Sequence, residues 1–136
     1  MRAVCLTLIA LLSTACSTPT EPKLGDEFEL HVGESAALTD VGLWVAFLGV
    51  GEDSRCPLQA MCVWAGDAAV LLETAPLPDA LAADSRTDTL HTHVDPMLLQ
   101  LGSLELVLVR LDPYPETPLS IGQDTYIATL MTRRVR

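Results

Sequence analysis

Two cysteines in the middle of the chain, Cys56 and Cys62, could form a disulfide, a pair of metal-binding thiolates or a redox-active dithiol. Two thiolates supply only half of a tetrahedral metal site, and no further Cys or His lies near them in the sequence. Their spacing also differs from the Cys-x-x-Cys of redox motifs. We therefore expect a disulfide if the protein folds in an oxidising compartment, with the metal site and the dithiol as alternatives.

A second group that could do chemistry consists of His91, His93 and Asp95. On a β-strand, residues two positions apart share one face, and two imidazoles with a carboxylate are suitable metal ligands. The alternating Leu90 and Val94 are apolar and should face the core, so the same pattern also describes three polar side chains that face water. Metal binding by these three residues is therefore the alternative hypothesis, beside an ordinary solvent-exposed strand face.

Sequence motifs of catalysis are missing. There is no Gly-x-Ser-x-Gly nucleophile elbow, and the Gly-x-Gly at residues 49–51 lacks the rest of a phosphate-binding fingerprint. A chain of this size always offers some combination of His, Asp and Ser, but no local pattern selects one set. We therefore predict no enzymatic activity and no cofactor, with a hydrolase of unrecognised site as an alternative.

The N-terminal segment has the parts of a secretory signal. Arg2 is the only charged residue among residues 1–15, residues 3–12 are apolar apart from Thr7, and small residues follow. The apolar stretch is too short to span a bilayer, which takes about 20 residues. Cleavage before Cys16 is the expected processing, and an ordinary signal peptide cut at another bond is the alternative.

The segment Leu11-Leu12-Ser13-Thr14-Ala15-Cys16 resembles the lipobox of bacterial lipoproteins, with a serine where leucine is commonest. The resemblance implies that residues 1–15 are removed and that a diacylglyceryl group joins the sulfur of Cys16. It also implies an acyl chain such as palmitate on the new N-terminus, and two or more such chains anchor a protein stably. Because Ser17 follows rather than aspartate, the sorting rules of the family imply the outer membrane in a Gram-negative host.

The charge balance excludes several partners. The chain has 8 Lys and Arg against 18 Asp and Glu, a net charge of −10, and loss of Arg2 with the signal makes it −11. Nucleic-acid binding requires clustered basic residues, so we expect none. Electrostatic attachment to anionic lipid is excluded for the same reason, which leaves the acyl chains as the expected membrane anchor.

Short apolar or alternating segments predict a single all-β domain over residues 25–136, preceded by the lipidated cysteine and a flexible tether at residues 16–24. Residues 27–32 alternate polar and apolar, and residues 43–50 are apolar on both faces, which is typical of a central strand. Further strands are expected at residues 36–38, 68–73, 90–94, 104–111 and 125–132. About seven or eight short strands favour an antiparallel β-sandwich or barrel-like domain with one disulfide.

The most distinctive stretch reads Glu-Asp-Ser-Arg-Cys-Pro at residues 52–57 and Cys-Val-Trp-Ala-Gly at residues 62–66. It resembles a segment of small, poorly characterised secreted proteins and lipoproteins of bacteria. This resemblance implies no activity and no catalytic residues.

In physical terms, a disulfide would staple this loop, and Arg55 has Glu52 and Asp53 as possible partners. Loops held by a rigid scaffold often carry binding residues, which makes Asp53, Arg55 and Trp64 candidates for a recognition loop. A purely structural staple is the competing interpretation, because a disulfide stabilises whether or not anything binds the loop.

Together these features predict a membrane-anchored lipoprotein of the bacterial cell envelope with a non-catalytic role. We expect loops 52–66 and 113–118 to contact an envelope protein or a wall polymer. The alternative function is periplasmic metal binding by His91, His93 and Asp95.

Overall fold

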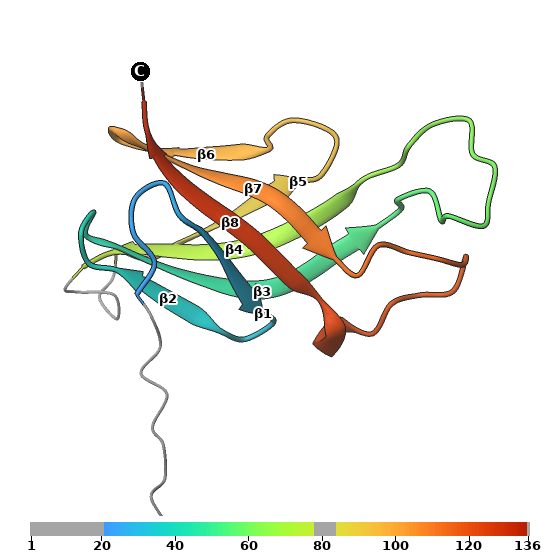
Figure 1. Cartoon of the computed structure of the whole chain (residues 1–136), viewed down its shortest axis with the longest axis horizontal. Coiled ribbons are helices and arrows are strands. Elements are labelled where there is room, and N and C mark those ends of the chain that lie inside the picture. The colour runs from blue at the N-terminus through green and yellow to red at the C-terminus, as the bar shows by residue number, and fades with distance from the viewer. Residues whose placement is uncertain (1–20, 78–83, 136) are drawn as a thin grey trace, which may run out of the picture.

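The computed structural model describes residues 21–77 and 84–135, so the expected signal peptide and Cys16 lie outside the described residues. Eight strands form two four-stranded antiparallel sheets (Figure 1). The first sheet has the order β1 (Glu27–His31), β8 (Ile127–Arg134), β7 (Leu104–Asp112) and β6 (Leu98–Leu101). The second has the order β2 (Ser35–Leu38), β3 (Leu43–Asp53), β4 (Ala68–Pro76) and β5 (Arg86–His91). The prediction of an all-β sandwich is confirmed; the sheets do not close into a barrel.

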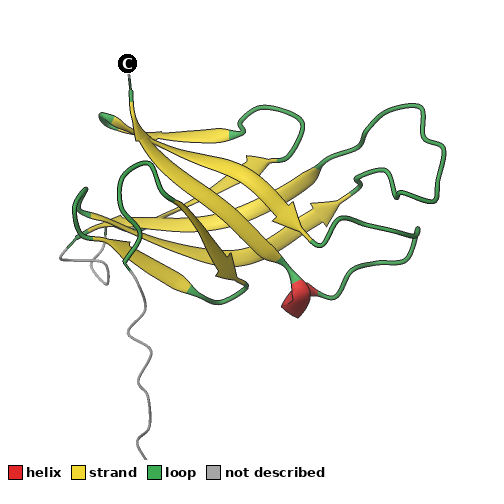
Figure 2. Ribbon diagram, viewed as in Figure 1, coloured by secondary structure: helices red, strands yellow, loops and turns green. Residues whose placement is uncertain are grey.

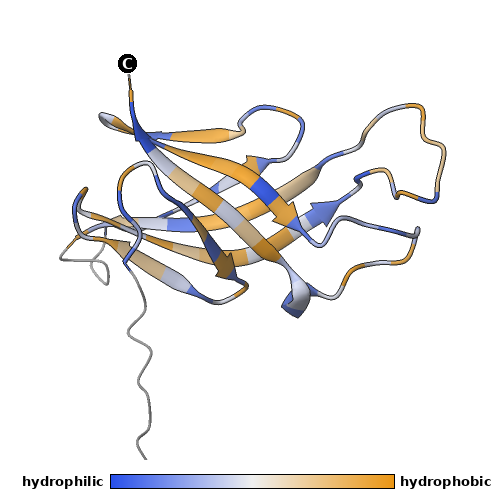
Figure 3. Cartoon of the chain, viewed as in Figure 1, coloured by the Kyte–Doolittle hydropathy of each residue, from blue (hydrophilic) through white to orange (hydrophobic). Residues whose placement is uncertain are grey.

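The core lies between the two sheets and follows the alternation of the strands. On β1, Leu30 is buried between the exposed Glu29 and His31. β3 lies between β2 and β4, and its residues 45–47 are all buried, as its apolar sequence predicts. The largest fully buried apolar side chains come from both sheets, among them Phe47, Leu38, Leu72, Leu90, Leu106 and Leu130. Figure 3 shows the matching hydrophobic stretches along the strands.

Three expectations about strands were wrong. β6 was not predicted, and the strand expected at residues 90–94 is β5, which begins at Arg86 and ends at His91. The chain bends after His91, whose backbone N–H donates to the carbonyl of Pro96 at 2.9 Å. This bend leaves Val94 42% exposed instead of buried. The last expected strand starts later than residue 125, because residues Gln123–Thr125 form a 3-10 turn before β8.

Three connections leave the sandwich at the same end, and the two longest of them project to the right in Figure 2. They follow β3, β5 and β7, and with the last residues of β3 and β7 they comprise residues 52–67, 92–97 and 112–126, which we call the loop end. The opposite end carries the turns at residues 39–42 and 102–103. Residues 21–24 also lie there, since Leu24 N–H donates to Asp40 Oδ2 at 2.8 Å and Thr39 Oγ1 donates to Glu21 Oε2 at 2.8 Å. The segment that leads to Cys16 thus joins the domain at the end opposite the loop end.

Candidate functional site

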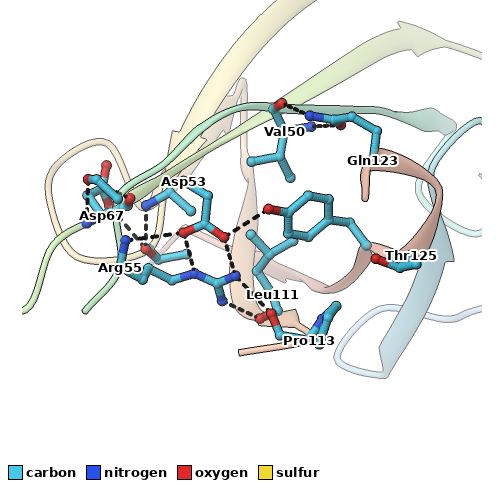
Figure 4. A network of polar contacts seen from close by, with 12 residues as sticks. Val50, Asp53, Arg55, Asp67, Leu111, Pro113, Gln123 and Thr125 are labelled. Atoms are coloured by element: carbon cyan, nitrogen blue, oxygen red, sulfur yellow. Dashed lines mark hydrogen bonds and ion pairs between the residues drawn. The ribbon is translucent and has the colours of Figure 1, made fainter. Parts of the chain in front are cut away.

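The loop end is built around Arg55, a charged side chain with only 4% exposure. Its Nε and Nη2 donate to the two carboxylate oxygens of Asp53 at 2.9 and 2.6 Å, a bidentate ion pair (Figure 4). Its Nη1 donates to the carbonyl of Leu111 at 2.7 Å, and Nη2 also donates to the carbonyl of Pro113 at 2.9 Å. One buried guanidinium therefore joins the end of β3 to the end of β7.

Asp53 is saturated with hydrogen bonds. Its Oδ1 also accepts from the backbone N–H of Arg55 at 3.2 Å, and its Oδ2 accepts from Tyr126 Oη at 2.9 Å. Burial alone would raise the pKa of Asp53, but the hydrogen bonds from Arg55 and Tyr126 outweigh it and hold that pKa below its usual value. Burial and the bond to Asp53 raise the pKa of Tyr126 to about 12. The cluster is therefore an ionised carboxylate whose charge is balanced by one arginine and which also accepts a hydrogen bond from a neutral tyrosine.

Backbone hydrogen bonds join the two loops that sequence reasoning proposed separately. The N–H groups of Leu58 and Gln59 donate to the carbonyls of Pro115 and Glu116, both at 3.0 Å. The Tyr114 ring centroid lies 5.2 Å from the Arg55 guanidinium carbon, within the range of a cation–π contact. The loops at residues 54–67 and 113–122 therefore behave as one unit at the loop end.

The disulfide closes the first of these loops. Cys56 and Cys62 are bonded with an S–S distance of 2.07 Å, which confirms the expected pairing. The base of the loop is held by two backbone bonds of 2.7 Å, from Cys56 N–H to Ala65 and from Ser54 N–H to Asp67. Gly66 has a φ of +73°, and a Cβ there would lie 1.9 Å from the Ser54 carbonyl oxygen. This position of the Cys-Val-Trp-Ala-Gly motif accordingly requires glycine.

The histidines occupy different positions from those predicted. β5 ends at His91, so His91, His93 and Asp95 do not share one strand face. His91 Nδ1 instead lies 2.5 Å from Asp67 Oδ2. Among residues 21–77 and 84–135, no group of three or more His, Cys, Asp and Glu side chains is placed to hold a metal ion. The structure therefore does not gather the proposed three ligands, because the chain turns where a longer strand was expected.

Asp67 is a structural residue that sequence reasoning missed. Besides His91, its carboxylate accepts from Thr92 Oγ1 at 3.1 Å and from the backbone N–H of His93 at 2.9 Å. Burial raises its pKa, but these hydrogen bonds outweigh that effect and lower the pKa below its usual value. Asp67 thus ties loop 54–67 to the loop that follows β5.

Gln123 is a second structural residue that sequence reasoning missed. Its Nε2 donates to the carbonyl of Val50 at 2.5 Å, and its Oε1 accepts from the N–H of Val50 at 3.1 Å (Figure 4). The pairing of β3 with β4 is irregular on both sides of Val50. The side-chain amide therefore holds the far end of β3 to the segment before β8, across 73 positions of sequence.

A cleft of about 460 Å³ lies between the joined loops. Asp53, Arg55, Gln123 and Tyr126 line it, and all four are engaged in the hydrogen bonds described above. Within the described part of the chain, the buried side-chain polar atoms without a partner are the hydroxyls of Thr129 and Thr132, neither of which lines the cleft. Among the described residues, the buried polar side chains that line the cleft therefore already have hydrogen-bond partners within the protein.

These loops expose large apolar side chains. The described residues include five large apolar side chains that are more than half exposed, and all lie at the loop end: Leu58, Met61, Val63, Trp64 and Leu119. Four of them belong to residues 56–66, a segment without any charged residue that we call the tip loop. Such clusters of exposed apolar side chains commonly mark interaction surfaces. Of the candidate recognition residues, Trp64 is 59% exposed, whereas Asp53 and Arg55 form the support beneath.

In the described ranges, no helix is both long and apolar enough to cross a membrane. No protein-family model matches the sequence, and comparisons with curated proteins and with solved structures find no significant similarity.

Proposed function

We propose that this protein is a lipid-anchored, non-catalytic binding protein of the bacterial cell envelope that contacts its partner through the tip loop. The observation that carries the proposal is the position of the five most exposed large apolar side chains, all at one end of the sandwich. Tryptophan and methionine are both enriched at protein interfaces, and Trp64 and Met61 lie in this group. A water-exposed cluster of this kind gains stability when a partner covers it.

The construction beneath the tip loop supports a binding role. The disulfide, the buried Arg55 and the backbone bonds to residues 115 and 116 fix the loop before any partner arrives. A preorganised loop loses little conformational entropy on association, which leaves more of the apolar contact energy for affinity. The same polar groups that fix the loop are saturated, so the cleft offers little for acid–base or nucleophilic chemistry.

The place of the tether supports the expected orientation. Glu21 is five positions after Cys16 and lies beside Thr39, close to the start of β3, whereas the tip loop follows the end of β3. At about 3.3 Å per residue, the length of β3 separates these ends by about 30 Å. A lipid on Cys16 would therefore hold the anchored end near the membrane and direct the tip loop away from it.

The membrane attachment is tested by Cys16→Ala in a native host. We expect the wild-type chain in the membrane fraction with an acylated N-terminal cysteine, and the variant in the soluble fraction or unprocessed. A wild-type protein that keeps residues 1–15 and carries no lipid would contradict the anchor.

The binding role is tested by affinity capture from envelope extracts with two matched variants. Trp64→Ala removes the exposed tryptophan of the tip loop, and Leu48→Ala removes a 44% exposed side chain of β3. We expect Trp64→Ala to lose the captured component at an unchanged melting temperature and Leu48→Ala to retain it. Equal capture by both variants would show that the tip loop does not bind the partner.

A further inference from the structure

The tip loop is uncharged, but the rest of the loop end is rich in acidic residues. The loop end contains seven acidic residues and one arginine, a formal charge of −6 out of −10 for the whole chain. The acidic residues are Glu52, Asp53, Asp67, Asp95, Asp112, Glu116 and Asp124. The arginine is Arg55, which is buried and paired with Asp53. The loop end is therefore strongly acidic and its own arginine is buried, while the exposed Arg110 just outside it pairs with Asp112.

Four of these acids are exposed and free for a partner. Glu52, Asp95, Glu116 and Asp124 make no ion pair with any residue that the structure describes. Asp112, in contrast, is bound by Arg110, which also contacts Glu29. The four unpaired carboxylates are distributed over all three connections of the loop end.

We propose that the tip loop docks into a protein partner whose surface is an apolar pocket rimmed by lysine and arginine. The inference rests on the proposed binding function and specifies the chemistry of the partner. Interfaces commonly combine an apolar centre with a polar rim, and complementary rim charge steers association and excludes wrong partners. An uncharged tip within an acidic rim is complementary to an apolar pocket within a basic rim.

Two other occupants fit the charge less well. A bilayer surface that contains anionic lipid would repel an end of charge −6 that has no exposed basic residue. A second copy of the chain in a symmetric contact would bring two such ends together, because a twofold interface pairs the same patch on both subunits. Opposite charge on a protein partner meets neither objection.

The test uses Trp64 as the reporter. The sequence has two tryptophans, so Trp44→Phe leaves Trp64 as the single one. The probe is a synthetic amphipathic helix of leucine and lysine, and its counterpart has glutamate in place of lysine. We expect the lysine peptide to shift the Trp64 emission to shorter wavelength, with an affinity that falls at least about tenfold as salt is raised. The glutamate peptide should leave the emission unchanged.

Two variants separate the apolar tip from the acidic rim. Leu58→Ser with Val63→Ser keeps every charge and should weaken peptide binding about tenfold or more. Glu52→Gln with Glu116→Gln keeps the apolar tip and should reduce both the affinity and its salt dependence. All four positions are exposed, so the melting temperature should stay within the range of ordinary surface substitutions.

Several results would overturn the inference. Unchanged binding by the Leu58 and Val63 variant would mean that any polycation adheres to the acidic end. An equal emission shift with phosphatidylcholine vesicles would identify a bilayer as the occupant, and a shift that depends on protein concentration alone would identify a second copy. If Trp64→Ala and Leu48→Ala capture the partner equally, the proposed function itself is contradicted. If a partner is captured but its surface is not basic, only this inference is contradicted.

Discussion

The two ends of the sandwich differ in the loops that connect their strands. At the end opposite the loop end, the described turns at residues 39–42 and 102–103 are short, and Gly42 and Gly102 have positive φ with open space where a Cβ would lie. Two of the three connections at the loop end are long, and loops longer than about 12 residues are uncommon without a functional reason. Residues 54–67 belong to that class. The long loops therefore carry stabilising contacts of their own, in addition to the hydrogen bonds of the strands.

The surfaces of the two ends differ in the same sense. All five large apolar side chains that are more than half exposed lie at the loop end. At the opposite end, Val135 beside Ser103 is an exposed large apolar side chain of the described residues, and it is only 39% exposed. Exposed apolar side chains do not themselves stabilise the fold. The loops that carry them are held by the buried Arg55, the disulfide and the close approach at Gly66. Substitutions at the two ends can test this comparison.

Arg55→Ala should have the largest effect. It leaves the buried carboxylate of Asp53 without its cation and two backbone carbonyls without a donor. We expect a loss of about 3–5 kcal/mol in the free energy of unfolding, measured by urea denaturation. The control is Arg86→Ala, which breaks an exposed ion pair with Asp88 and should cost about 0–1 kcal/mol. Similar losses in both variants would refute the structural role of Arg55.

Gly66→Ala should come next, with Gly102→Ala as its counterpart at the opposite end. Both glycines have positive φ, at +73° and +62°, so both variants incur backbone strain of about 1–2 kcal/mol. Only at Gly66 does the new Cβ also collide with the backbone of Ser54, which raises the expected total to about 3 kcal/mol or more. Equal melting temperatures for the two variants would contradict the close approach at the base of the loop.

Removal of the disulfide by Cys56→Ser with Cys62→Ser should have a smaller effect. Closure of a loop of this length is worth about 2 kcal/mol in the chain-entropy model. Because Arg55 holds the loop base independently, we expect the variant to remain folded with the tip loop more mobile. Hydrogen exchange should show faster amide exchange confined to residues 56–66, and exchange spread over both sheets would contradict a local role.

The pH dependence of stability should show the smallest effects, at both extremes. The pKa values of Asp53 and Asp67 are lowered in the folded state, so their contribution is present above the usual value of 3.8. It is lost as the pH falls through the folded values. Tyr126 has a pKa raised from 10.0 to about 12, so its contribution is present below pH 10 and is lost as the pH rises towards 12.

Ultraviolet absorbance during an alkaline titration measures the tyrosine effect directly, because the chain contains only Tyr114 and Tyr126. We expect one tyrosine to ionise near pH 12, and the Tyr126→Phe variant should lack that step. A Tyr126→Phe variant that still shows it would place the hydrogen bond to Asp53 in doubt.

The sequence predicted what depends on local pattern. Alternation placed β1, the apolar run placed β3, and the cysteine count together with the expected compartment predicted the disulfide. The pairing of Arg55 was narrowed to Glu52 or Asp53, and Asp53 is the partner. These features involve residues close together in the chain or a periodicity that can be read directly.

The parts that were missed depend on distant residues. Tyr126 reaches Asp53 and Gln123 reaches Val50 across 73 positions each, and no local pattern records such contacts. The strand expected at residues 90–94 ends at His91 instead. Asp67, which lies in the loop after β3, binds the His91 side chain where the chain bends, and the sequence around His91 does not reveal this contact. The apolar tip loop could have been noticed from the absence of charge between residues 56 and 66.

Site-specific photo-cross-linking in the native host tests the binding surface most directly. A photoreactive residue is placed at Val63 in the tip loop or, as the matched control, at Val109 on β7, which is 42% exposed. We expect a discrete adduct with one envelope component from position 63 and none from position 109. Adducts of equal yield from both positions, or none from position 63 while the protein remains folded and processed, would contradict it.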